Sequence, residues 1–279
     1  MTSTRERRFS IVNVFTTEPF GGNPLCVFED AEDLDASTMQ AVARQLNLSE
    51  TTFVLPSSHP ECDVRVRIFT PHAEMPMAGH PTIGTAFVLG RDRLVFEEGV
   101  GPVEVERVAD DVWQMTQPPL RVERSVDVSA ALPILGLARE DLLPDLPIQI
   151  ASTGNPFMMM PLRDVSILSR ISLSTEAWAR FEDLAHGVYP FAPTETGVQA
   201  RLLGVPGISE DPATGSAAGP LAAYLRHHRW TTDGPLEVRQ GVEMGRPSTI
   251  TVDCVQREGA WVPKVRGPSV RIGTGVLFL

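Results

Sequence analysis

Short apolar runs with a two-residue period dominate the chain and predict strands along most of its length. Alternating or β-branched residues fill six segments of strand length, which are 65–70, 101–108, 111–117, 201–205, 248–255 and 269–279. Two further short strands, 11–15 and 147–151, each lead into a turn that contains Gly-Asn-Pro. The pattern therefore indicates a protein built mainly from β-sheet.

Helical periodicity is clear in fewer segments. Residues 36–48, "ASTMQAVARQLNL", place apolar side chains on one face, with Ser37 and Gln40 as a capping box and Asn47 as a left-handed stop. Two later segments, 81–90 and 216–228, are apolar nearly all round. Because such helices suit an enclosed position better than a wet surface, we expect each to lie inside a rolled sheet. Pro220 is expected in the first turn of the second one or at a later helix start.

Two landmarks recur along the chain at nearly the same offset. The tripeptide that begins at Gly22 returns at Gly154, an offset of 154 − 22 = 132, and the small-residue segment at Gly79 returns at Gly215, an offset of 215 − 79 = 136. Chance recurrence could explain one such match, but it explains two matches with nearly equal spacing less well. We therefore expect an α+β fold of two similar lobes, each a rolled sheet around a central helix.

The lobe boundaries follow from proline positions and from strand edges. Pro118 and Pro119 interrupt the strand pattern, so the first lobe is expected to span 8–119. The C-terminal strand, 265–279, is expected to return to this lobe and cover the edge of its first strand. The second lobe is expected to span 120–264.

Composition and charge exclude several classes of function. The 279 residues are 42% hydrophobic, which suffices for well-formed cores. Three widely spaced cysteines predict neither a disulfide framework nor a zinc site, and they suit a cytoplasmic location. The net charge of −11 and the scattered arginines argue against a nucleic-acid partner. We expect no export signal and no membrane span, because the apolar stretch after the N-terminal "RERR" is short and interrupted.

The cofactor motifs are also missing from the sequence. Lys264 is the single lysine, so neither a pyridoxal phosphate anchor nor the lysine of a phosphate-binding loop is available elsewhere. No GxGxxG follows a strand, and no HExxH or carboxylate cluster suggests a metal site. We therefore expect chemistry without a cofactor or a metal, on a small molecule.

The starts of the two apolar helices carry the first candidate residues. Main-chain N–H groups near Gly79 and Gly215 and the partial positive charge of a helix N-terminus suit a substrate carboxylate, if the two helix starts face each other across a cleft. His80 lies at one start, and Asp211 and Ser216 lie at or near the other. On position alone, helix capping is the simpler interpretation of Asp211 and Ser216, and His80 fits a structural turn residue equally well.

Glu50 is the third candidate, because it lies where the helix over 36–48 ends and a strand begins. A solvated turn carboxylate is the simpler interpretation of that position. However, a carboxylate at the lip of an apolar cleft can move protons to and from carbon, and the second lobe has no similar "SETTF" segment. Asn23 and Asn155, each before a proline, are expected to hold turns. Met158–Met160, Trp178 and Trp230 are expected in the core.

Four segments together resemble the phenazine-biosynthesis PhzF-like family. These segments are "VNVFTTEPFGGNPLCVF", "LNLSETTFVLP", "RIFTPHAEMPMAGHPTIGTAFVL" and "ISEDPATGSAAGPLAAYL", and they occur in order along the chain. The resemblance implies the two-lobed diaminopimelate epimerase-like fold, with mostly antiparallel, barrel-like sheets. It also implies a cofactor-independent isomerase, typified by conversion of trans-2,3-dihydro-3-hydroxyanthranilate, in secondary metabolism and commonly as a homodimer.

The resemblance also assigns roles to single residues. The family's catalytic glutamate corresponds to Glu50, its GHP histidine to His80, and the aspartate and serine of its DPATGS motif to Asp211 and Ser216. The epimerases of this fold use two cysteine thiols at the helix starts, where this chain has "AGHP" and "TGSA". The resemblance therefore disfavours a two-thiol racemase.

These residues suggest a mechanism and leave two alternatives open. Glu50 would remove a proton from a carbon and return it elsewhere in a conjugated system, while His80 bonds the delocalised anion and Asp211 fixes an amine. The N–H groups around Gly79, His80, Gly215 and Ser216 would hold the carboxylate. The alternatives are an epimerase or racemase of a small amino acid on the same fold, and a family member that binds a small molecule without catalysis.

Overall fold

The fold is described from a computed structural model, for residues 6–231 and 234–279, and consists of two compact units. Unit 1 contains the chain up to Thr116 together with Arg266–Leu279, and unit 2 contains Gln117–Val265. The long last strand, β18 (Ala260–Phe278), begins in unit 2 and ends in unit 1. No helix in the described ranges is both long and apolar enough to cross a membrane.

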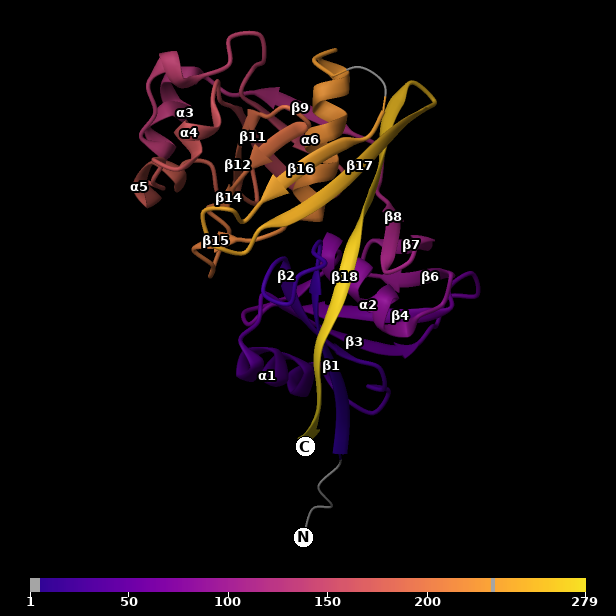
Figure 1. Ribbon diagram of the computed structural model, residues 1–279. Coiled ribbons are helices and arrows are strands. Elements are labelled where there is room, and N and C mark those ends of the chain that lie inside the picture. The colour runs from indigo at the N-terminus through magenta and orange to yellow at the C-terminus, as the bar shows by residue number, and fades with distance from the viewer. Residues whose placement is uncertain (1–5, 232–233) are drawn as a thin grey trace. The chain divides into compact units, whose positions relative to one another are not determined.

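Unit 1 is a closed β-barrel. Its remaining elements are β1 (Glu6–Val14), β2 (Asn23–Phe28), α1 (Ala36–Leu46), β3 (Glu50–Pro56), β4 (Val64–Phe69), β5 (Glu74–Met75), α2 (Gly79–Leu89), β6 (Arg93–Glu98), β7 (Gly101–Ala109) and β8 (Val112–Thr116). Neighbouring strands pair in the order β1, β2, β3, β4, β6, β7, β8 and β18. The barrel closes because β18 also pairs antiparallel with β1, beside which it runs in Figure 1.

Helix α2 fills the barrel of unit 1. It contacts β1, β2, β3, β7 and β8, and all of its residues except Phe87 and Leu89 are buried. A Cβ atom added to Gly84 would lie 2.6 Å from a Leu25 methyl and 2.7 Å from a Val14 methyl. The glycine therefore lets the helix approach β1 and β2 closely. The enclosed helix predicted from its all-apolar sequence is confirmed.

Unit 2 repeats this arrangement with more helical insertions. Its elements are β9 (Arg121–Ser125), α3 (Val128–Leu135), the 3₁₀ turn η1 (Arg139–Asp141), β10 (Gln149–Ser152), β11 (Pro156–Pro161), α4 (Val165–Leu168), α5 (Thr175–Trp178), β12 (Val188–Pro193), β13 (Gly197–Ala200), β14 (Leu202–Leu203), β15 (Glu210–Asp211), α6 (Gly215–His227), β16 (Leu236–Gln240) and β17 (Ser248–Arg257). Helix α6 contacts β10, β11 and β17.

The order of strand pairing is the same in the two units. From β1 to β7 the successive pairs are antiparallel, parallel, antiparallel, parallel and antiparallel. From β10 to β17 they follow the same sequence. The two similar α+β lobes predicted from the recurring landmarks are thus confirmed by topology.

The two ends of α1 correct one local prediction and confirm another. The cap of α1 is Asp35, whose carboxylate accepts from the Thr38 N–H at 2.7 Å, so the predicted capping box of Ser37 and Gln40 is wrong. An earlier aspartate with the right reach to Thr38 takes the cap position. The left-handed stop at Asn47 is confirmed, with φ of 51°.

Pro220 is tolerated inside α6, contrary to both predicted positions. The helix begins at Gly215 and continues unbroken to His227, so Pro220 lies beyond its first turn. Its ring removes the N–H that would bond the Ser216 carbonyl four residues earlier. The helix survives because it is buried along nearly its whole length, and packing compensates for one missing bond.

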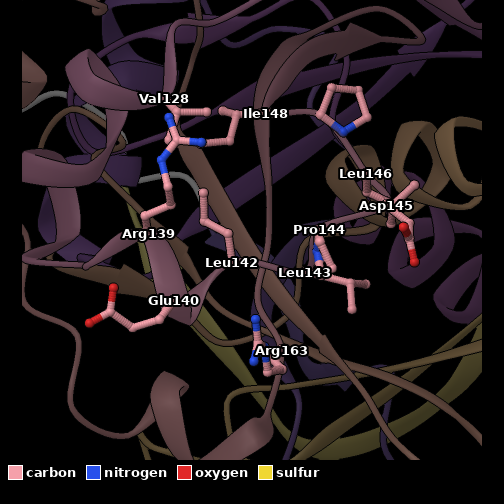
Figure 2. Close-up of a pocket in the computed structure, with 11 residues that line it drawn as sticks. Val128, Arg139, Glu140, Leu142, Leu143, Pro144, Asp145, Leu146, Ile148 and Arg163 are labelled. Carbon is pink, nitrogen blue, oxygen red and sulfur yellow. The ribbon is translucent and has the colours of Figure 1, made fainter.

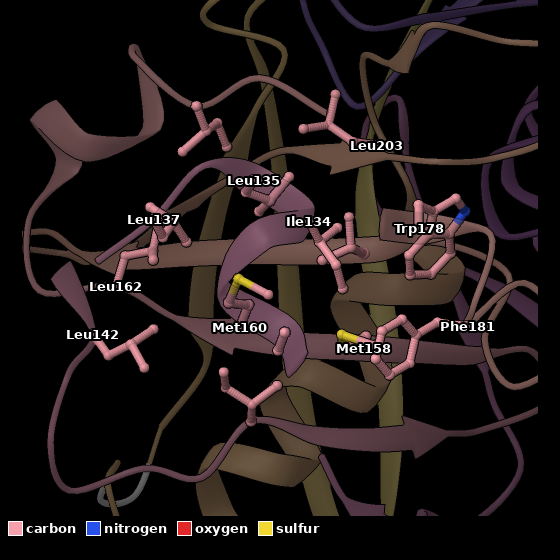
Figure 3. Close-up of a cluster of buried hydrophobic side chains, with 14 of the residues drawn as sticks. Ile134, Leu135, Leu137, Leu142, Met158, Met160, Leu162, Trp178, Phe181 and Leu203 are labelled. Atoms are coloured by element: carbon pink, nitrogen blue, oxygen red, sulfur yellow. The ribbon is translucent and has the colours of Figure 1, made fainter. Parts of the chain in front are cut away.

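One apolar cluster of unit 2 includes buried side chains of α3 and β11 (Figure 3). Met158 and Met160 pack there with Ile134, and the Trp178 and Phe181 rings stack at 6.4 Å. The core positions predicted for Met158–Met160 and Trp178 are therefore confirmed. Trp230 is only partly buried, because it follows the end of α6, and its predicted core position is wrong.

Candidate active site

Glu50 and His80 are brought together in unit 1. Glu50 is the first residue of β3 and pairs with Leu25 of β2, directly after the left-handed turn at Asn47 that ends α1. His80 is the second residue of α2. Its Nε2 atom lies 3.2 Å from Oε2 of Glu50, and the side chain of Glu50 is 17% exposed. The carboxylate therefore reaches both the imidazole and solvent-accessible space.

The His80 imidazole is neutral in this environment. Burial lowers its pKa to about 3, and a main-chain hydrogen bond with Pro24 opposes the shift. Nδ2 of Asn23 lies 3.1 Å from Nδ1 of the ring. Proline has no N–H, so the Pro24 group in the main-chain bond is the carbonyl oxygen, which accepts from a ring nitrogen. Nε2 makes no hydrogen bond among the described residues, so its 3.2 Å approach to Glu50 is a polar contact with a neutral ring.

Asp211 and the start of α6 form a buried polar network in unit 2. The Thr214 hydroxyl donates to the Asp211 carboxylate, and Gln240 connects the two residues. The Gln240 amide donates to the Asp211 carbonyl at 2.7 Å and contacts the Thr214 hydroxyl at 2.9 Å. Its oxygen accepts from the Thr214 N–H at 3.1 Å and from the Tyr189 hydroxyl at 2.8 Å. Burial, and secondarily the Asp211 charge, raises the pKa of the Tyr189 hydroxyl, which stays protonated as a donor.

The cap position of α6 is Thr214, so neither Asp211 nor Ser216 occupies it. Ser216 is the second helical residue and is 7% exposed. At the start of a helix the first N–H groups have no partner within the helix. Gly215 and Ser216 in α6, and Gly79 and His80 in α2, occupy such positions.

A family profile described as phenazine biosynthesis-like protein matches residues 12–275. The chain belongs to this family. It is 40% identical to the trans-2,3-dihydro-3-hydroxyanthranilate isomerase of Pseudomonas aeruginosa, over 86% of this chain and 88% of that protein. Relatives of this similarity are named isomerases, and this family member is an isomerase.

Solved structures have the same fold. A PhzF-family phenazine biosynthesis protein of Bacillus anthracis superposes with a TM-score of 0.89 at 25% identity, over 99% of this chain and all of that one. A hydroxyproline epimerase from Agrobacterium vitis superposes with a TM-score of 0.69 at 15% identity, covering 100% of this chain and 94% of that one. The diaminopimelate epimerase-like architecture expected from the resemblance is confirmed for this family member.

Two cavities of unit 2 lie among residues other than those predicted for the site. A cavity of about 770 Å³ is lined by Leu142, Pro144, Ile148 and the exposed Arg139 and Arg163, among others (Figure 2). A second, of about 790 Å³, surrounds the Gly204 turn. Among the described residues no group of three or more histidines, cysteines or carboxylates could hold a metal.

Several residues that support the site were not predicted as part of it. Asn23 was expected only to hold a turn, yet it is fully buried against His80. Gln240 and Thr214 carried no sequence signal, because a polar residue in a strand or before a helix is common. Gln117 is also fully engaged: it donates to the Gly215 carbonyl at 2.9 Å and accepts from the Thr153 hydroxyl at 2.7 Å.

Replacing Gly219 by alanine tests how tightly Gln117 is held. The new Cβ atom would lie 1.8 Å from Oε1 of Gln117, so this side chain must move and lose its two buried bonds. We expect a loss of about 1–2 kcal/mol in the free energy of unfolding, because the packing and hydrogen-bond costs exceed the helix propensity gained. Urea denaturation measures it. Gly273→Ala, with no atom within 4 Å of the added Cβ, is the matched control and should change little.

Proposed function

We propose that this chain isomerises trans-2,3-dihydro-3-hydroxyanthranilate or a related unsaturated amino acid by moving a proton between two carbons. The observation that carries the proposal is the 3.2 Å approach of the Glu50 carboxylate to Nε2 of a buried, neutral histidine. A neutral imidazole beside the carboxylate adds no positive charge that would weaken it as a base. Two relatives at 40% and 38% identity are named for this reaction.

The proposed reaction needs one acid–base group and no oxidant. The ionised Glu50 takes the proton from a substrate carbon, and the C–H bonding electrons enter the conjugated system. The protonated Glu50 then returns a proton to a different carbon of that system, which consumes the same electron pair. His80 stabilises the delocalised anion by a hydrogen bond. The carboxylate is regenerated, so the cycle is balanced.

We propose candidate binding groups for the polar parts of the substrate in each unit, at the start of its buried helix. The N–H groups of Gly215 and Ser216, and those of Gly79 and His80, suit the substrate carboxylate. The Asp211 carboxylate suits the amino group, and its orientation is fixed by the Thr214 hydroxyl. This assignment is supported by the rigidity of the Asp211 environment, in which each amide atom of Gln240 has two polar partners.

Thiol chemistry is the less suitable alternative for this chain. Burial raises the pKa of Cys26 to about 12 and, with a smaller contribution from Asp253, that of Cys254 to about 12. Neither thiol is ionised at neutral pH, and a thiolate is the reactive form. An epimerase reaction would therefore also depend on Glu50 rather than on a pair of cysteines.

Replacing Asp211 by asparagine is expected to weaken substrate use. The variant keeps the side-chain shape and the site of the Thr214 contact but loses the charge that attracts an ammonium group. A hydrogen bond to a charged group contributes about 2–3 kcal/mol, which corresponds to a loss of roughly 30- to 150-fold in kcat/KM. Steady-state kinetics measures it. Asp145→Asn, at an exposed position of the same unit, is the control, and an unchanged kcat/KM in Asp211→Asn would remove Asp211 from the site.

The reaction itself is tested by proton NMR of the purified protein with trans-2,3-dihydro-3-hydroxyanthranilate. Loss of the diene signals, with conversion proportional to enzyme concentration, is the expected result. A parallel sample with free amino acids in deuterated buffer reports exchange of the α-hydrogen. Exchange there, together with an unchanged diene, would replace the proposed isomerisation by an epimerase reaction.

A further inference from the structure

Glu98 is a buried carboxyl group for which the proposed reaction has no use. It is the last residue of β6 and is 5% exposed. The turn that follows it packs against the segment that precedes α2. Val100 N–H donates to the Pro76 carbonyl at 3.2 Å, and a Cβ atom on Gly99 would lie 2.7 Å from the Pro76 Cα. The side chain of Glu98 is thereby held beside the first turn of α2.

One hydroxyl group connects Glu98 to the start of α2. The Thr82 Oγ1 atom lies 2.6 Å from Oε1 of Glu98 and 2.7 Å from the main-chain oxygen of Ala78, which is the cap residue of the helix. The threonine hydroxyl carries a single proton, so it can donate to only one of these oxygens. If Glu98 is ionised, one of the two short contacts joins two acceptors with no proton between them.

A protonated Glu98 satisfies both contacts. Its O–H donates to Thr82 Oγ1, and the threonine hydroxyl donates to the Ala78 carbonyl. The second carboxyl oxygen, Oε2, is buried and has no hydrogen-bond partner in the described part of the chain. Burying an uncharged carbonyl oxygen there without a partner costs much less free energy than burying one oxygen of an ionised carboxylate.

We propose that Glu98 is a positioning residue that stays protonated at neutral pH and, through Thr82, holds the first turn of α2 and with it His80. This inference rests on the proposed function insofar as His80 serves catalysis. Ionisation of Glu98 withdraws the Thr82 proton from the Ala78 carbonyl and places a charge beside the turn. The contact between His80 and Glu50 then loses its fixed geometry.

Charged side chains lie near Glu98, but they pair with one another. Glu98 borders a cavity of about 320 Å³ that is also lined by Arg65, Arg67, Glu74 and Glu97. Arg67 donates to both oxygens of Glu74 at 2.7 Å, and Arg65 lies 3.9 Å from Glu97. None of the ion pairs among the described residues involves Glu98.

Burial is the main influence on the pKa of Glu98. His80, on the same turn of α2, is neutral. Burial raises the pKa of Glu98 from its ordinary 4.5 to about 8, and the Thr82 hydrogen bond opposes the shift.

The pH dependence of unfolding tests the protonation state without any substrate. A carboxyl whose pKa is raised by folding holds a proton that the unfolded chain releases. Its contribution to stability is therefore full below pH 4.5 and is lost as the pH rises to about 8. Across that window the ratio of the unfolding constants of the wild type and Glu98→Gln should change by up to about tenfold per pH unit. Glu104→Gln, at an exposed position, should retain the wild-type slope. Equal slopes for the wild type and Glu98→Gln would overturn the proposal.

The pH dependence of turnover tests the positioning role. The kcat of the wild type should fall above a pH of about 8, with a smaller change in KM, and Glu98→Gln should lose this alkaline limb because glutamine donates at every pH. Glu98→Leu, which cannot donate to Thr82, should lower kcat by roughly tenfold throughout. An alkaline limb retained in Glu98→Gln would refute the positioning role. A protein with no turnover would contradict the proposed reaction, while the unfolding experiment would still decide the state of Glu98.

Discussion

Replacing Gln240 by leucine is expected to lower the free energy of unfolding by about 3–5 kcal/mol, because several buried polar groups lose their partner together. Gln240 is fully buried. Its amide binds the Asp211 carbonyl, the Thr214 N–H and hydroxyl, and the Tyr189 hydroxyl, at 2.7–3.1 Å. Leucine has a similar size but makes none of these four hydrogen bonds. Denaturation by urea measures the loss.

Graded controls separate this network from a general packing effect. Tyr189→Phe removes a single bond to Gln240 and should cost about 1 kcal/mol. Gln40→Leu removes one bond from a half-buried glutamine, which donates to the Thr70 carbonyl at 2.9 Å, and should also cost about 1 kcal/mol. A loss of only this size in Gln240→Leu would show that the network does not hold Asp211.

Much of the fold could be predicted from sequence because the repeat is visible in unusual residues. The Gly-Asn-Pro turns and the apolar helix starts recur with the same spacing, and each marks the same place in the two units. An all-apolar helix such as α2 also predicts its own environment, since burial on every side is the only stable solution. These signals depend on the residues themselves and not on distant partners.

The local errors have more than one cause. Asp35 and not Ser37 caps α1, although both types suit a cap. Pro220 remains inside α6 because packing around the helix outweighs the missing bond. Nothing in the sequence marks Gln240, because its side-chain partners come from two distant segments, one at Tyr189 and one at 211–214.

The sequence also predicts only part of the candidate site. Glu50 and His80 were identified by motif, and unit 1 places them 3.2 Å apart. Their pairing could not be predicted from position, since 30 residues separate them and their contact depends on how α2 lies inside the barrel. The role of Asn23 against the imidazole became visible only with the ring nitrogen facing it at 3.1 Å.

Replacing Glu50 by glutamine is expected to lower kcat by about 1,000-fold or more, because the same carboxylate both takes and returns the proton. Glutamine keeps the shape and can still contact Nε2 of His80, but it cannot accept a proton from carbon at neutral pH. KM should change much less, since the proposed binding groups are elsewhere. Initial rates over a range of substrate concentrations separate the two constants.

The control for this variant is Glu61→Gln, at an exposed turn position, which should turn over like the wild type. The unfolding midpoints of both variants should remain close to that of the wild type. A Glu50→Gln variant that lost activity only because it unfolded would leave the acid–base role without support.

The most direct test is a parallel proton NMR time course of the wild type and Glu50→Gln, at equal concentration, with trans-2,3-dihydro-3-hydroxyanthranilate. We expect the wild type to consume the diene signals and the variant to leave them unchanged over the same period. Conversion by Glu50→Gln within about tenfold of the wild-type rate would contradict the assignment of Glu50 as the group that carries the proton.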